Sequence, residues 1–98
     1  MELVFEWNPE KARSNLRKHG VSFKEAITVF SDKLARIVTD EDHSDAELRE
    51  IVIGHSLQQR LLFVNFTARN NRIRIFSARQ ATRKERIRYE EYNKKKKK

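Results

Sequence analysis

Four apolar runs separated by short polar segments occupy the middle of this 98-residue chain. They cover residues 34–38, 48–55, 60–69 and 72–78. Short runs rich in branched and aromatic side chains are typical of β-strands. Because the connections are short, successive strands can form hairpins, so no parallel pairing is needed. We therefore expect an antiparallel meander of about four strands.

The last of these runs alternates in polarity along its length. Its expected core-facing residues are Ile73, Ile75 and Ser77. The opposite face, from Arg72 to Phe76, carries two arginines and one aromatic ring. Such alternation is typical of a sheet with one face in water, and here that face is basic.

The N-terminal segment predicts a short strand followed by a helix. Residues 2–7 alternate as a strand does. Asn8 can cap a helix. Pro9 suits the first helical position, because an N–H there would have no partner within the helix and proline has none. We expect this helix to reach about Lys18, with Gly20 providing the left-handed residue that ends it.

Two further helices are predicted at residues 23–31 and 83–93. A capping box, Ser or Thr followed three residues later by Glu, precedes each of them. The resulting fold class is α+β, with two N-terminal helices, the meander and one C-terminal helix. We expect a single domain over residues 1–93 and a disordered lysine-rich tail at 94–98.

Composition excludes several classes of protein. The chain has no Cys, so it has no disulfide, thiolate metal ligand or thiol nucleophile. Its two Gly cannot form a phosphate-binding loop or a dinucleotide motif. No run approaches the ~18 to 20 apolar residues of a membrane span, and the N-terminus lacks the pattern of a secretion signal. We expect a cytoplasmic protein that needs no cofactor and binds no membrane.

The net charge of +8 is distributed unevenly. Residues 40–59 hold one Lys or Arg against six Asp and Glu, whereas residues 60–93 hold nine against three. Clustered arginines are typical of phosphate contacts, because the planar guanidinium binds a phosphate with two hydrogen bonds. Arg79 and Arg83 flank the start of the last helix, where we expect them to hold a phosphate. The alternative is a basic strand face and helix that simply keep the protein soluble.

Histidines are the candidate acid–base groups for RNA cleavage. His19 and His43 could transfer protons at neutral pH, whereas His55 is expected to be a sheet surface residue. The acidic segment 40–45 could hold a hard cation, but it lacks the glycine and terminal glutamate of a calcium loop. We therefore expect no metal site.

The chain resembles the BrnT family over nearly its whole length. The segments that carry the resemblance are FEWNPEKARSNLRKHGVSFKEAITVF, DEDHSD, IGHS and RIRIFSARQATRKERIRYEE. The resemblance implies a ribonuclease toxin of a type II toxin–antitoxin system, with a fold similar to the RelE group. It also implies a BrnA antitoxin of the ribbon-helix-helix type, RNA as substrate, inhibited translation, and contact with DNA only through the antitoxin.

The family motifs assign candidate site residues. They fall here on Trp7, Lys11, His19, His43, Ser44, Arg49, Arg69, Ser77, Arg79 and Arg83. Of these, the expected catalytic residues are His19, His43, Arg79 and Arg83. The expected RNA-binding residues are Lys11, Arg49, Arg69, Arg72, Arg74 and Arg86. Trp7 could stack on a base, although burial in the core is the more frequent role of a large aromatic residue.

Four positions depart from the family pattern without removing a candidate catalytic side chain. They are Asn8, where Asp is common, Lys33, where Pro is frequent, and Ala46 and Asn71, where Gly is frequent. A non-catalytic or attenuated module that still binds its antitoxin is therefore the alternative function. The antitoxin could contact either the acidic segment 40–50 or the arginine face.

Overall fold

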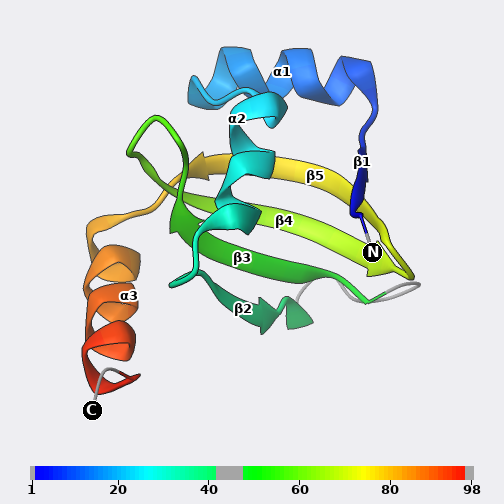
Figure 1. Ribbon diagram of the computed structural model, residues 1–98. Coiled ribbons are helices and arrows are strands. Elements are labelled where there is room, and N and C mark those ends of the chain that lie inside the picture. The colour runs from blue at the N-terminus through cyan, green and yellow to red at the C-terminus, as the bar shows by residue number, and fades with distance from the viewer. Residues whose placement is uncertain (1, 42–47, 97–98) are drawn as a thin grey trace.

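A computed structural model describes residues 2–41 and 48–96. It contains one five-stranded sheet in the order β1-β5-β4-β3-β2, with α1, α2 and η1 over one face and α3 at one end (Figure 1). The strands are β1 (Val4–Glu6), β2 (Arg36–Thr39), β3 (Glu50–His55), β4 (Leu61–Arg69) and β5 (Arg72–Gln80). The helices are α1 (Pro9–His19), α2 (Phe23–Ile27), the 3-10 turn η1 (Thr28–Ser31) and α3 (Arg83–Lys96).

The antiparallel meander is confirmed, but the sheet is mixed. Strands β2 to β5 pair antiparallel with their neighbours in the chain. Strand β1 pairs parallel with β5, with Phe5 opposite Ile73, so the prediction that no parallel pairing is needed is wrong at this edge. The two strands are separated by most of the chain, so no hairpin turn sets their relative direction.

A β-bulge changes the faces of β5. Asn65 pairs with Ser77, but the next residue of β4, Phe66, pairs with Ile75, so Phe76 has no partner of its own in β4. One extra residue moves all later side chains to the other face of the sheet. Ala78 therefore lies in the core in place of the predicted Ser77.

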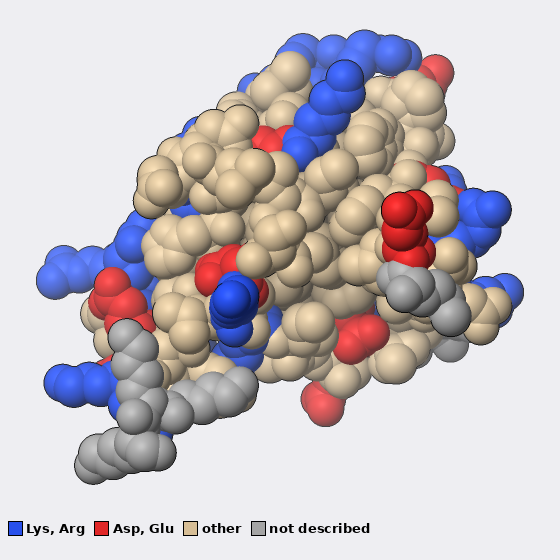
Figure 2. All heavy atoms as spheres, viewed as in Figure 1, with Lys and Arg blue, Asp and Glu red and all other residues tan. Residues whose placement is uncertain are grey.

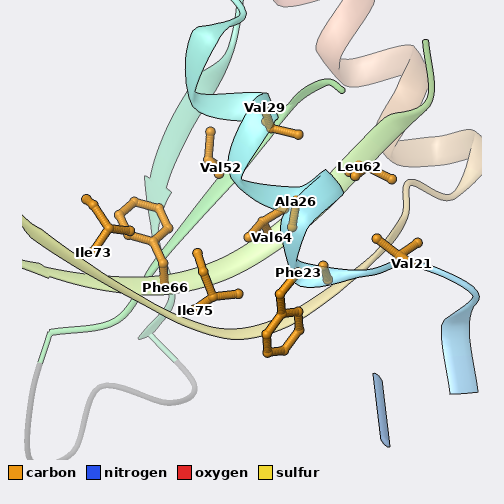
Figure 3. Close-up of a cluster of buried hydrophobic side chains, with 11 residues drawn as sticks. Val21, Phe23, Ala26, Val29, Val52, Leu62, Val64, Phe66, Ile73 and Ile75 are labelled. Carbon is orange, nitrogen blue, oxygen red and sulfur yellow. The ribbon is translucent and has the colours of Figure 1, made fainter. Parts of the chain in front are cut away.

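The core lies between the sheet and the α2–η1 segment (Figure 3). Phe23, Ala26 and Val29 point from this segment toward the sheet, and each is at most 2% exposed. The buried sheet residues of this cluster are Val52, Leu62, Val64, Phe66, Ile73, Ile75 and Ala78. Burial of a Val, Leu, Ile or Phe side chain contributes about 1.5–3 kcal/mol, so this layer fixes α2 and η1 on the sheet.

Helix α1 begins at Pro9 and ends at His19, as the capping residues indicated. Among its residues, Asn15 alone is fully buried. Its side-chain amide donates to the carbonyls of Val21 and Ala78 at 2.9 and 2.7 Å, and its oxygen accepts from the Ala78 N–H at 3.0 Å. Beyond the end of β1, Asn15 thus makes the hydrogen bonds to β5 that a neighbouring strand would otherwise make.

Helix α3 is held on the sheet by polar contacts. The buried Tyr89 hydroxyl donates to Asp32 at 3.0 Å and lies 3.4 Å from His55 Nδ1. Burial, together with the neighbouring Asp32 carboxylate, raises the pKa of Tyr89 to about 12. The helix extends to Lys96, three residues into the segment that we expected to be disordered. No helix within residues 2–41 and 48–96 is long and apolar enough to cross a membrane.

A buried carboxylate joins α2 to the β3–β4 connection. Glu25 is 6% exposed and accepts hydrogen bonds from the Ser56 hydroxyl at 2.7 Å and from Arg60 Nε at 2.9 Å. A further Arg60 nitrogen donates to the carbonyl of Gly20 at 3.0 Å. The Arg60 guanidinium holds the pKa of Glu25 below its ordinary value of 4.5.

Acid should weaken this network in a defined direction. Because the pKa of Glu25 is lower in the folded state, its contribution is complete above the unfolded value and is lost as the pH falls through the folded value. Replacing Glu25 with Gln should cost about 1–2 kcal/mol at pH 7, less than for a fully buried pair because Arg60 is partly exposed. Urea unfolding at decreasing pH should show this difference shrinking. The same substitution at exposed Glu90 is the control, and a constant difference across pH would contradict the assignment.

Candidate functional site

A small pocket lies where one face of α1 meets the bulge in β5. Its volume is about 200 Å³. The lining residues are Lys11, Ser14, Asn15, Lys18, His19, Phe76 and Ser77. The bulge presents Phe76 and Ser77 side by side at this point, and bulges are frequent next to active sites. We call this pocket the Phe76 site.

Two cations share the aromatic ring at the centre of the site. Lys11 Nζ lies 5.5 Å from the centroid of Phe76, and Arg49 Cζ lies 4.0 Å from it. Cation–π attraction holds each charge near the ring, although the charges repel one another. An anion between them would relieve this repulsion, so the arrangement suits a phosphate.

His19 contributes an exposed imidazole from the last turn of α1. Gly20, with a φ of 66°, ends the helix immediately after it. Lys18 lines the same pocket and adds another positive charge. The C-terminal end of a helix stabilises positive side chains through its dipole, so α1 supports this local charge.

A chain of hydrogen bonds supports the floor of the site. The Ser77 hydroxyl donates to Asn65 Oδ1 at 3.1 Å, and Asn65 Nδ2 donates to Asp40 at 2.7 Å. This chain crosses from β5 through β4 to the end of β2. It fixes the Ser77 side chain on the face opposite the core.

The two arginines predicted to hold a phosphate lie at the α3 side of the sheet. Arg79 donates to both oxygens of Glu85 at 2.8 and 2.9 Å, and its guanidinium stacks 4.1 Å above the Phe63 ring. The Glu85 carboxylate raises the pKa of Arg79, and Arg79 lowers that of Glu85. This ion pair gives Arg79 a structural role in fastening α3. Arg83 and Arg86 are exposed on α3.

The remaining predicted arginines line a second, larger cleft. Its volume is about 480 Å³. The lining residues are Glu6, Leu48, Thr67, Ala68, Arg69, Arg72 and Arg74. Figure 2 shows basic residues over α1, over α3 and near the β4–β5 turn, with a few isolated charged residues on the surface between them. The predicted arginines thus lie on more than one part of the surface.

The structure therefore groups only some of the predicted site residues. His19, Lys11 and Arg49 come together around Phe76, whereas Arg79 pairs with α3. His43 and Ser44 lie outside the described residues. Trp7 is half-buried and forms a T-shaped pair with Phe23, with 6.0 Å between the ring centroids.

Sequence reasoning missed Lys18, Ser14 and Phe76 as site residues. One signal was available, because Lys11, Ser14 and Lys18 recur at helical spacing and so share a face of α1. The role of Phe76 depends on the bulge, which alternation did not reveal. Within the described residues, no three His, Cys, Asp or Glu side chains gather closely enough to hold a metal ion.

Comparison with known proteins decides the family. The family model for the ribonuclease toxin BrnT of type II toxin–antitoxin systems matches residues 7–85. This chain belongs to the BrnT family. The crystal structure of the Brucella abortus ribonuclease toxin BrnT shares the fold, with a TM-score of 0.60 and 23% identity over 85% of this chain and 99% of that one. No curated protein sequence matches the chain significantly.

Membership of the BrnT family implies a toxin with a cognate antitoxin as partner. The matched region contains the whole Phe76 site, from Lys11 and His19 on α1 to Ser77 on β5. It also contains all of the meander. The pocket is thus built from the part of the chain that defines the family.

Proposed function

We propose that this BrnT protein cleaves single-stranded RNA at the Phe76 site. The observation that carries the proposal is the pair of cations on the Phe76 ring beside the exposed imidazole of His19. Cleavage of RNA needs a base for the 2′-hydroxyl and positive charge at the phosphate. The Phe76 site supplies both kinds of group within one pocket.

The reaction that fits these groups is an internal transesterification. His19 removes the proton of the 2′-hydroxyl, whose oxygen attacks the adjacent phosphorus. The bond from phosphorus to the 5′-oxygen breaks, and this oxygen takes a proton from water in the open pocket. Lys11, Lys18 and Arg49 stabilise the extra negative charge on the phosphate oxygens in the transition state. The products are a 2′,3′-cyclic phosphate and a 5′-hydroxyl, and this route requires no metal ion.

The proposed cellular effect is inhibition of translation by RNA cleavage, as the resemblance to the BrnT family implies. We propose an antitoxin of the ribbon-helix-helix type as the partner that neutralises it. His43 remains a candidate proton donor, and Arg83 and Arg86 remain candidate RNA contacts at the α3 side.

The experiment is a cleavage assay with purified protein and a fluorescently labelled single-stranded RNA in the presence of EDTA. We expect cleavage with cyclic phosphate ends, reduced at least tenfold by Lys11→Ala, because one positive contact to the transition state is lost. Arg13→Ala, which removes an exposed charge from the same helix, is the matched control. Intact RNA that binds in a salt-dependent manner would overturn the proposal in favour of a non-catalytic binding module.

A further inference from the structure

The cleft at the other end of β5 is organised by a single acidic residue. Arg72 and Arg74 extend from the same face of β5, where their charges repel one another. Arg72 Nη1 donates to Glu6 Oε1 at 2.9 Å, and Arg74 Nη1 donates to Glu6 Oε2 at 3.1 Å. The parallel pairing of β1 places Glu6 opposite Arg74, so these two ion pairs form only in the folded sheet.

The cleft stays positively charged although Arg72 and Arg74 both pair with Glu6. A guanidinium has five N–H donors, so each arginine can bind a further anion while Nη1 stays on Glu6. The side chains of Arg72 and Arg74 are 65% and 44% exposed, so a ligand can reach them from solvent. With Arg69 on the same wall, the cleft contains three arginines against one carboxylate. The cleft is therefore suited to bind an anion that carries more than one charged group.

The cleft and the Phe76 site are neighbours along β5. Arg74 precedes Phe76 by two residues on β5, which is about 7 Å of extended strand. On the other wall, Leu48 lines the cleft and the next residue, Arg49, covers the Phe76 ring. A chain molecule held at Phe76 can therefore extend along β5 to the arginines of the cleft. This proximity favours a polynucleotide over an acidic segment of a partner protein.

We propose that the cleft formed by Arg69, Arg72 and Arg74 binds the phosphates of nucleotides that flank the cleaved bond. The proposal rests on the proposed function and specifies its substrate as an extended single strand. A positive groove that follows the backbone, next to an aromatic side chain, is how single-stranded nucleic acid is commonly bound. Glu6 acts as a positioning residue that keeps two guanidiniums aligned for successive phosphates.

The first test compares substrates of different length. For the wild-type protein, kcat/KM should rise from a dinucleotide to an RNA of about ten nucleotides. The double variant Arg72→Gln/Arg74→Gln should lose about 10- to 100-fold on the longer RNA and nothing on the dinucleotide. Arg13→Gln/Arg17→Gln removes the same charge from exposed positions of α1 and should behave as wild type. Equal losses on both substrates, or none, would overturn the proposal.

The second test measures binding without cleavage. The probe is a 2′-O-methylated RNA of about ten nucleotides, titrated at several salt concentrations. Loss of two phosphate contacts should lower the slope of log affinity against log salt by about 1.4. An oligoglutamate peptide that binds the wild type and not the double variant, while RNA binding stays the same, would overturn the proposal in favour of an acidic partner segment.

These tests separate the two proposals. A protein that cuts no RNA but binds the probe with a slope dependent on the cleft refutes the ribonuclease assignment and supports the cleft. A protein that cuts RNA with the same kcat/KM at every length supports the ribonuclease assignment and refutes the proposal for the cleft. Thermal unfolding verifies that the double variant is folded, and Arg69→Gln, at an exposed position, provides a second variant of the same cleft.

Discussion

Replacing His19 with alanine should lower the rate of RNA cleavage by about 10²–10⁴-fold, the usual contribution of a general base. His19 is exposed at the end of α1, so its removal should leave the fold and the affinity for uncleavable RNA nearly unchanged. Single-turnover cleavage with saturating protein measures the chemical step directly.

The control for this substitution is the other histidine within the described residues. His55 lies against Tyr89 with 5.5 Å between ring centroids, on the α3 side of the sheet. His55→Ala should weaken the attachment of α3 but should not slow cleavage. Cleavage by His19→Ala within threefold of wild type would show that another group is the base.

Replacing Asn15 with leucine should lower the free energy of unfolding by about 3 kcal/mol. The substitution leaves the carbonyl of Val21 and both the N–H and the carbonyl of Ala78 without their hydrogen-bond partner. Each buried polar group that loses its partner costs about 1–3 kcal/mol, partly offset by the apolar side chain. For a domain of this size the melting temperature should fall by more than 10 °C.

Arg13→Ala on the exposed face of the same helix is the control, with an expected change within about 0.5 kcal/mol. Chemical denaturation of both variants gives the free energies. A change as small as that of the control would mean that the edge of β5 is not closed by Asn15. Because Asn15 also lines the Phe76 site, the folded fraction of Asn15→Leu should cleave RNA more slowly.

The helices and the meander could be predicted because their signals are local. Asn8 and Ser22 cap their helices with side-chain oxygens, as their positions indicated. Strands β3, β4 and β5 follow one another in space because each is linked to the next by a short connection. The parallel placement of β1 beside β5 had no such local signal, since it depends on packing between the two ends of the chain.

The candidate site shows the same division. Lys11 and His19 could be assigned to one helix from the sequence. Their meeting with Arg49 depends on the bulge that places Phe76 between them, a feature of strand pairing and not of composition. For Arg79 the sequence provided the positive charge, whereas the structure assigns it a partner, Glu85, six residues further on.

The sequence by itself determined the α+β class, the order of the elements, the family and the excess of arginine in the last third of the chain. The tertiary structure decided how that charge is used, because side chains on different elements meet only after the sheet has formed. In that third, Arg79 pairs with Glu85 on α3, whereas Arg72 and Arg74 are aligned by Glu6 in the cleft. The arginine at Phe76, Arg49, comes from the middle of the chain. A charge count cannot make this division, since the same guanidinium binds a carboxylate or a phosphate according to which one the fold places beside it.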